Sequence, residues 1–402
     1  MFRSEFPILE EKVHSNPLVY FDNAATTHTP RCVVNAIINY YYKYNSNVHR
    51  GAHFLSQQAT TKFEKARESI ANHFNVKFNQ CIFTRGTTHG INMLIYGVEH
   101  TIQKGDEIIL SVLEHHSNFV AYQELAKRTG AVLKFVPLTE NHEFDYIAFE
   151  NALSHQTKII ALPLVSNVLG EKLDILRLRK MTEFYSDAYV FYDAAQLVGH
   201  EEIDFTSLKC SAIIFSAHKC YGPTGIGAII ASHKLISTLK PIEFGGAMIE
   251  EVTFENSTYK RDFSKLEAGT PDICGAIAFS EAIKFIEGAN LKEIIRHEQN
   301  LIDYFLKKAT LIEGLKIYGT LNSNKKMGIF SMTYKNYSSY DIATLLDMKG
   351  IALREGAHCA QPLLQVLGVP STFRVSFAMY NTKEEIDSFF DSLELVDSML
   401  GG

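Results

Sequence analysis

The chain has 402 residues, of which 46% are hydrophobic and 21% are charged, and its formal net charge is −6. This length and composition predict a globular protein of roughly two or three domains. The sequence has no basic block, so nothing favours nucleic acid or an anionic membrane surface as a partner. We expect the partner to be a small polar metabolite.

Six cysteines are scattered along the chain without a C-x-x-C pair: Cys32, Cys81, Cys210, Cys220, Cys274 and Cys359. This spacing signals neither a zinc site nor a disulfide framework, so we expect no metal and a reducing compartment. The N-terminus lacks the apolar core of a signal peptide, and no apolar run reaches the ~18 residues that span a bilayer. These features predict a cytoplasmic protein, with an organellar protein that has lost its presequence as the alternative.

The first half of the chain alternates expected strands and helices. A weakly helical segment at 2–13, a strand at 19–21 and helices at 31–44 and 55–74 come first. A strand that ends at Thr84 then opens a series of strands at 107–112, 133–137, 158–165, 188–192 and 212–215, with helices at 118–130, 146–153 and 173–185 between them. Because these strands are apolar on both faces, they predict a mostly parallel sheet covered by helices on both sides.

Polar residues follow several of these strands where each one ends. His115, Asn167, Asp193 and Lys219 occupy such positions. One alone is readily explained as a hydrogen-bonded cap, but four of them favour a site at the carboxyl edge of the sheet. At another strand end, Gly86-Thr87-Thr88 leads into a helix and is typical either of a phosphate site or of an ordinary threonine cap.

The second half of the chain is expected to form a smaller domain. Residues 245–272 are too poor in apolar residues for a core and predict an excursion that bears a hairpin. Helices at 273–288 and 291–311 then lead to strands at 315–318, 328–334 and 372–377 and helices at 339–349 and 383–399. We expect a large domain at 20–288 and a small domain formed by 1–19 and 289–402.

Lys219 lies in the segment SAIIFSAHKCYGPTGIG, at 211–227. A lysine carries chemistry only when its amine is neutral, and a polar shelf at the end of a buried strand allows this. A solvated lysine after a core strand is the alternative. The segment resembles the pyridoxal-phosphate (PLP) lysine motif of Suf-type (group II) cysteine desulfurases, which are fold-type I PLP-dependent enzymes of the class-V aminotransferase family.

The resemblance covers about 20–381 and implies an α/β fold like that of aspartate aminotransferase. It implies a large domain with a mostly parallel seven-stranded sheet and a smaller α+β C-terminal domain. It also implies residues that bind the cofactor: Lys219, Asp193 on the pyridinium nitrogen, Gln196 on the ring oxygen, His115 on the ring face, a phosphate cradle of Thr87, Thr88, Ser216 and His218, and Thr270 reaching into the neighbouring subunit.

Cys359, in REGAHCAQP, follows a strand expected at 351–354. It matches the cysteine that receives sulfur, and we expect it to act with Lys219 and His115 in catalysis. Arg354 and His358 are close in sequence, and positive neighbours favour a thiolate. Arg374 matches the residue that anchors the substrate carboxylate. The remaining residues expected to bind substrate are Asn167, Arg354, His49 and Arg50.

The implied activity converts L-cysteine to L-alanine and leaves a persulfide on Cys359, supplying sulfur for iron–sulfur cluster assembly. The implied assembly is a homodimer served by a SufE-like or SufU-like acceptor that docks beside the 245–272 excursion, with Suf scaffold proteins as indirect partners. His89, Glu355 and Ala357 depart from the usual family pattern.

The sequence leaves three other functions open. The same fold serves selenocysteine lyases and cysteine sulfinate desulfinases. A class-V aminotransferase with an incidental Cys359 and a non-catalytic assembly subunit are the other two. Retention of Lys219, Asp193, Arg374 and Cys359 together argues against the last of these.

Overall fold

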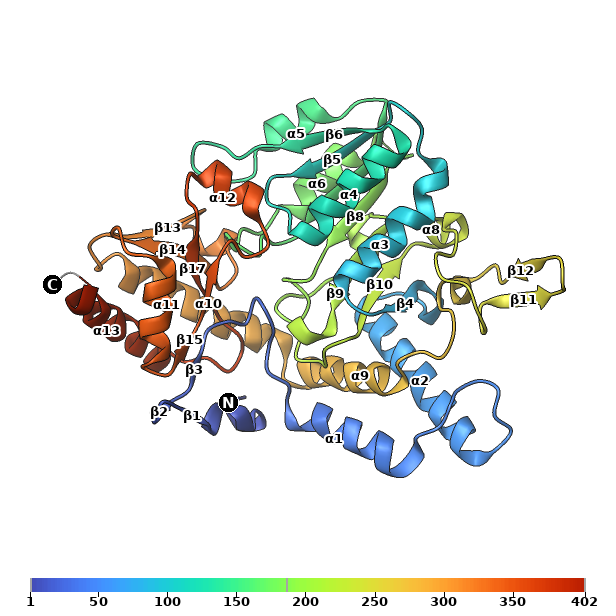
Figure 1. The fold of residues 1–402 in the computed structure, drawn as a ribbon, viewed down its shortest axis with the longest axis horizontal. Coiled ribbons are helices and arrows are strands. Elements are labelled where there is room, and N and C mark those ends of the chain that lie inside the picture. The colour runs from blue at the N-terminus through green and yellow to red at the C-terminus, as the bar shows by residue number, and fades with distance from the viewer. Residues whose placement is uncertain (1, 186, 401–402) are drawn as a thin grey trace.

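The computed structural model describes residues 2–185 and 187–400, and a seven-stranded sheet forms its centre (Figure 1). The antiparallel pairings of the sheet involve β10, and the other neighbouring strands run parallel. The strand order across the sheet is β4 (Cys81–Thr84), β10 (Gly227–Ala231), β9 (Ala212–Ser216), β8 (Tyr189–Asp193), β7 (Thr157–Pro163), β5 (Glu107–Ser111) and β6 (Val132–Val136).

Helices cover both faces of this sheet because the central strands are apolar on both sides. In β9, Ile213 and Phe215 face one hydrophobic cluster, and Ile214 faces the other. The first face is covered by α2 (Phe54–His73), α5 (Tyr146–Ala152), α6 (Ile175–Thr182), α7 (Phe205–Leu208) and α9 (Ile273–Gly288), with α1 (Arg31–Asn39) packed on α9. The second face is covered by α3 (Thr87–Val98), α4 (His116–Thr129) and α8 (His233–Thr238).

A second sheet of four antiparallel strands lies in the C-terminal part of the chain. Its order is β13 (Leu315–Ile317), β14 (Ile329–Tyr334), β17 (Thr372–Ser376) and β16 (Arg354–Gly356). Around it lie α10 (Leu291–Ala309), α11 (Ser339–Asp347), α12 (Gln361–Leu367) and α13 (Lys383–Leu400). The N-terminal strand β3 (Val19–Tyr20) pairs in parallel with β15 (Ile351–Ala352), so both ends of the chain build this part. The domain division at 19/20 and 288/289 stays a prediction.

The predicted hairpin within 245–272 is present as β11 (Ile249–Val252) and β12 (Ser257–Tyr259). In Figure 1 it projects from the end of the molecule opposite α12. Within the described ranges, no helix has both the length and the apolar character needed to cross a membrane.

Three expected elements differ from the structure. The segment 2–13 is not one helix: it forms 3-10 turns at Arg3–Glu5 and Pro7–Glu10, and then β1 (Lys12–Val13) pairs with β2 (Asn16–Pro17), because Pro7 cannot donate within a continuous helix. The helix expected at 31–44 ends at Asn39 and continues as a π-helix, Tyr40–Tyr44. The strand expected at 351–354 is divided between two sheets as β15 and β16.

Candidate active site

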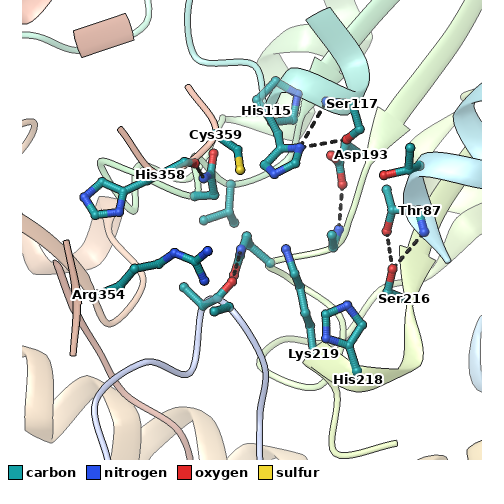
Figure 2. Close-up of a pocket in the computed structure, with 18 of the residues that line it drawn as sticks. Thr87, His115, Ser117, Asp193, Ser216, His218, Lys219, Arg354, His358 and Cys359 are labelled. Atoms are coloured by element: carbon teal, nitrogen blue, oxygen red, sulfur yellow. Dashed lines mark hydrogen bonds between the residues drawn. The ribbon is translucent and has the colours of Figure 1, made fainter. Parts of the chain in front are cut away.

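A cavity of about 260 Å³ opens at the carboxyl ends of β7, β8 and β9, beside the loop that follows β16 (Figure 2). It brings together most of the residues that the sequence pattern singled out, although these come from segments far apart along the chain. Those lining it are Thr87, Thr88, His115, Asn167, Asp193, Gln196, Ser216, His218, Lys219, Arg354, Cys359 and Arg374.

Lys219 ends a single 3-10 turn, Ala217–Lys219, that follows β9 directly. The side chain points into the cavity (Figure 2). Burial lowers the pKa of its amine to about 8, and the positive charges of Arg374 and Arg354 act in the same direction. The carboxylate of Asp193 opposes this shift. At pH 7 roughly a tenth of the amine is therefore neutral, far more than for an ordinary lysine, and the neutral form is the one that a nucleophilic lysine requires.

Asp193 is the last residue of β8 and is buried. Its Oδ1 accepts a hydrogen bond from the backbone N–H of Ala195 at 2.9 Å, while burial raises the pKa of its carboxyl. Gln196 lies one short turn further on and donates from Nε2 to the carbonyl of Ala24 at 2.8 Å. A carboxylate in this position suits a cationic ring nitrogen, because a partner of opposite charge offsets the cost of burial.

The N-terminus of α3 forms a cradle with the end of β9. The backbone N–H of Thr87 donates to Ser216 Oγ at 2.7 Å, and the two hydroxyls lie 2.8 Å apart. Gly86 precedes the helix with φ 133°, and a Cβ there would lie 3.1 Å from Ser216 Oγ, so glycine allows this close approach. No side chain caps the helix at Gly86. The exposed N–H groups and the helix dipole favour an anion at this position.

His115 occupies the N-cap position of α4 with a defined proton arrangement. Its Nδ1 accepts from the backbone N–H of Ser117 at 3.1 Å, so the proton of a neutral ring lies on Nε2. Burial lowers the pKa of this imidazole to about 3, and the nearby charges of Lys219 and Arg374 contribute. His115 is therefore neutral at physiological pH, and its Nε2 carries the proton that it can donate.

Cys359 lies on the loop between β16 and α12, and its side chain is exposed. The backbone N–H of His116 donates to the carbonyl of Cys359 at 2.7 Å, and the backbone N–H of Gln361 donates to His116 Nε2 at 3.0 Å. On the other side, Asn167 Nδ2 donates to the carbonyl of His358 at 2.7 Å. The loop is thus anchored at both sides of the thiol. Of the remaining five cysteines, four are buried and Cys32 is half-buried.

The expected role of His358 as a positive neighbour of the thiol is wrong. Its Nε2 lies 2.8 Å from the hydroxyl of Thr372, and the ring is buried. Burial lowers the pKa of His358 to about 3, helped by the charge of Arg374. The ring is therefore neutral, and the cations that interact with Cys359 are those of Lys219 and Arg374.

Arg374, in the middle of β17, is buried beside the cavity. Its Nη1 donates to the carbonyl of Asn167 at 2.8 Å, and its Nη2 donates to Asp22 Oδ1 at 3.2 Å. Its Nε is buried without a hydrogen-bond partner in the described structure. Arg354 approaches the same carboxylate, with its Nη1 3.8 Å from Asp22 Oδ2. The two guanidinium groups converge where a substrate carboxylate is expected.

Thr270, His49 and Arg50 do not join this cavity within the single chain. They line a second cavity of about 590 Å³ near the base of the β11–β12 hairpin, together with His89. There, His49 Nε2 lies 2.8 Å from Glu64 Oε1. Within one chain His49 and Arg50 therefore lie away from the first cavity, and their role in binding substrate stays a prediction. The expectation for Thr270 already placed it toward a neighbouring subunit.

Several residues around the cavity were not predicted from the sequence. Asp22 follows the strand at 19–21, so the strand-end rule that selected Lys219 would have found it, and Ala24 and Ala25 of the same turn line the cavity. His116 had no signal of its own, because its contacts with the Cys359 loop join segments far apart in the sequence.

The residues of the first cavity fit PLP. Lys219 and Asp193 face the same cavity, and the uncapped helix end with the Thr87 and Ser216 hydroxyls suits a phosphate. Within residues 2–185 and 187–400, no cluster of three or more His, Cys, Asp or Glu side chains is arranged to hold a metal ion.

Comparison with known proteins agrees with this geometry. A probable cysteine desulfurase of Staphylococcus epidermidis is 41% identical over 392 residues, which cover 97% of this chain and 94% of that protein. The apo structure of a cysteine desulfurase from Thermococcus onnurineus superposes with a TM-score of 0.93 at 35% identity, covering 98% of this chain and 97% of that one. The cysteine desulfurase CsdA from Escherichia coli gives a TM-score of 0.91 at 33% identity, covering 99% and 98%.

These solved structures confirm the predicted fold-type I architecture. The model of the class-V aminotransferase family matches residues 19–389, which include the lysine, the strand-end carboxylate and the cysteine loop. The chain belongs to the class-V aminotransferase family.

Proposed function

We propose that this protein is a PLP-dependent cysteine desulfurase of the Suf type. The observation that carries the proposal is that an exposed cysteine on an anchored loop faces the same cavity as a buried, partly neutral lysine. The cysteine desulfurases described above share the fold over nearly the whole chain. An aminotransferase has no use for a thiol at this position, so Cys359 favours sulfur chemistry over amino-group transfer.

PLP, when bound, supplies a protonated ring that withdraws electrons from the α-carbon of an amino-acid substrate. Asp193 would hold the ring nitrogen, while Thr87 and Ser216 would hold the phosphate. Arg374 and Arg354 orient the substrate carboxylate. Lys219, whose pKa is about 8, is suited to take and return the α-proton at Nζ, and His115 donates from Nε2.

Cys359 performs the sulfur step. Its thiolate attacks the substrate sulfur, so a sulfur–sulfur bond forms while the substrate carbon–sulfur bond breaks. The electron pair of the broken bond stays on the β-carbon, which takes a proton and leaves as alanine. Cys359 retains the persulfide at the cavity that Lys219 and Arg374 also line.

The experiment is alanine release from L-cysteine by wild type and by Cys359→Ser. The variant should keep the visible absorbance of bound PLP, because the thiol takes no part in holding the cofactor, but it should release little alanine and carry no persulfide. Turnover equal to wild type would place the nucleophile elsewhere. Parallel assays with selenocysteine and cysteine sulfinate decide among the three substrates.

We further propose a homodimer in which each subunit completes the other's site. Thr270, His49 and Arg50 lie together in the second cavity, away from the first. The surrounding segments expose large apolar side chains: Tyr42 is 84% exposed and Phe54 is 73% exposed. A two-fold assembly would bury this surface and bring Thr270 to the partner's cofactor phosphate. Light scattering that shows an active monomer at assay concentration would contradict the proposal.

A protein acceptor in the cytoplasm, SufE-like or SufU-like, would take the sulfur toward iron–sulfur cluster assembly. The β11–β12 hairpin projects away from α12 in Figure 1. Docking beside the 245–272 segment therefore requires the hairpin of one subunit to stand near Cys359 of the other. Alanine release should be slow without an acceptor and should accelerate when a cognate one is added. Full activity without any acceptor, unchanged when several are tried, would contradict this.

A further inference from the structure

The imidazole of His116 caps a helix that belongs to a distant part of the chain. Helix α12 begins at Gln361, and its N-cap residue, Ala360, has no side-chain oxygen to accept from the first turn. His116 supplies the missing acceptor from the start of α4, because its Nε2 accepts from the backbone N–H of Gln361 at 3.0 Å. The helix end directly after the cysteine loop is thus satisfied by this ring, whose own proton must lie on Nδ1.

Both sides of the turn that carries the thiol are tied to α4 through His116. Its backbone N–H donates to the carbonyl of Cys359 at 2.7 Å, in addition to the contact of its ring with the start of α12. Cys359 has φ 55°, a left-handed conformation that is costly for a residue other than glycine. Asn167 holds the far side of the loop through the carbonyl of His358. Loss of the imidazole contact alone would therefore free the α12 side of the turn and let Cys359 leave this conformation.

The surroundings of His116 keep its ring neutral at physiological pH. Burial lowers the pKa of this imidazole below its ordinary value of 6.5. Its titratable neighbours are His115, which is neutral and whose ring centre lies 6.3 Å away, and Cys359. The other residues of the groove between α4 and α12 carry no charge: Phe119, Val120, Gln123, Gln361, Pro362 and Gln365. The lone pair on Nε2 is therefore available at pH 7, and a proton would occupy it at low pH.

We propose that His116 is a positioning residue for the sulfur step: its neutral imidazole caps α12, and this cap holds the Cys359 loop in the conformation that attacks the substrate sulfur. The inference rests on the proposed function for the sulfur step itself. His116 does not line the cavity that suits the cofactor, so its loss should leave substrate binding unchanged. It should slow the first formation of alanine and persulfide, because these need the thiol in place.

The test compares wild type, His116→Gln and His116→Leu in the first turnover of the holoenzyme with L-cysteine. Glutamine keeps an oxygen that can reach the N–H of Gln361 and takes no proton in the pH range used, whereas leucine keeps bulk and removes the acceptor. Loss of one hydrogen bond that fixes the loop should slow alanine formation roughly five- to tenfold in His116→Leu, with KM unchanged. His116→Gln should stay within about twofold of wild type.

The pH profile distinguishes an acceptor from a ring that only fills space. As the pH falls from about 7.5 to about 5.5, protonation of His116 removes the acceptor in wild type, but glutamine keeps it. The first-turnover rate of His116→Gln divided by that of wild type should therefore rise as the pH falls. Other titrating groups, Lys219 among them, act on both proteins and cancel in this ratio.

Amide hydrogen exchange gives a readout that needs no activity. In a peptide covering 357–365, the N–H of Gln361 should exchange about fivefold faster in His116→Leu than in wild type or His116→Gln. This peptide has the same sequence in all three proteins, so its intrinsic exchange rates are equal. The control is Gln123→Leu, which removes a polar side chain from the same groove about two turns further along α4. It should change neither the exchange nor the rate.

The outcomes separate the two proposals. If wild type forms no alanine, the proposed function fails, and amide exchange still decides whether His116 holds the loop. Equal rates and equal exchange in His116→Leu and wild type would overturn the positioning role. So would a His116→Gln protein as slow as His116→Leu, a change confined to KM, or a rate ratio that does not vary with pH. Should His116→Leu fail to fold, the pH profiles of wild type and His116→Gln decide alone.

Discussion

Replacing Glu267 by glutamine should destabilise the protein strongly, because Glu267 is the partner of a fully buried arginine. The side chain of Arg67 is 1% exposed and donates to Glu267 Oε1 at 2.7 Å and Oε2 at 2.8 Å. The same carboxylate accepts from the backbone N–H of Phe83 at 2.7 Å. Glu267 opens the segment that leads to Thr270, so the pair also supports the wall of the second cavity.

The magnitude follows from the burial of the charge. Removing one member of a buried ion pair costs about 3–5 kcal/mol, because the remaining charge is left desolvated without that partner. The other partner of Arg67, Glu64 Oε2 at 3.3 Å from Nε, is 37% exposed and compensates the buried charge less well. At about 2.1 cal/mol/K per residue, the unfolding entropy of this chain is roughly 0.8 kcal/mol/K. The melting temperature of Glu267→Gln should therefore fall by about 4–6 °C. Removing both charges, with Arg67→Met added, should recover much of this loss, because the introduced glutamine still offers an acceptor to the backbone N–H of Phe83.

Thermal unfolding followed by circular dichroism, with cofactor saturating, measures these shifts. The control is Glu281→Gln, which breaks an exposed pair with Lys284 at 2.7 Å and should leave the melting temperature unchanged. A Glu267→Gln protein as stable as wild type would refute the reasoning. So would a double variant in which the two losses simply add.

Three further predictions concern the active site. Lys219→Ala should lose the visible absorbance of lysine-bound PLP, and an unchanged band would show that the cofactor is held elsewhere. The folded pKa of His358, about 3, lies below its unfolded value, so the unfolded chain binds more protons and stability falls as pH drops through about 6.5. Protonation of this histidine in the unfolded chain lowers the free energy of unfolding by about 2 kcal/mol at pH 5. Between pH 7 and pH 5, the melting temperature of His358→Asn should therefore fall less than that of wild type. An equal fall in both proteins would contradict the lowered pKa of His358. Gly356 has φ 105°, and a Cβ added there would meet open space. Gly356→Ala should therefore act through backbone strain, distort the Cys359 loop and slow alanine release. The control is Gly105→Ala, at φ 91° with similar open space, which should lower stability without changing alanine release. Equal activity in the two glycine variants would show that the loop tolerates the change.

Much of the fold could be predicted because its signals are local. Strands such as β9, with Ile213, Ile214 and Phe215 in succession, are apolar on both faces and could only be central strands. The carboxyl ends of parallel strands meet at one edge, so His115, Asn167, Asp193 and Lys219 were expected to converge before any contact was known. The residues of β10 do not show its direction. The connection at 217–226 is too short for a crossover to a parallel strand, and β10 runs antiparallel to both neighbours.

Properties that depend on burial, or on contacts between distant segments, could not be predicted from the sequence. His358 lies next to Cys359 in the chain and its residue type suggests a cation, yet its ring turns toward Thr372 and is buried, so it is neutral. The partnership of Arg67 with Glu267 joins positions 200 residues apart, and neither residue type is ordinarily buried. Similarly, the sequence could not show that His49 and Arg50 lie in the second cavity of the chain and away from the first.

Two adjacent histidines connect the cofactor side of the cavity with the cysteine loop. His115 caps α4 and faces the cavity, and His116 holds the loop through both its backbone N–H and its Nε2. The loop also contains two residues in the left-handed region, His358 at φ 50° and Cys359 at φ 55°, a conformation that costs roughly 1–2 kcal/mol per residue. Such a loop keeps its shape only while the anchors are in place, so a persulfide on Cys359 stays at the mouth of the cavity. Under the proposed function, an acceptor would have to bring its own nucleophile to the exposed sulfur. In the proposed dimer, the surface around α12 and the hairpin of the partner subunit would decide which acceptor fits.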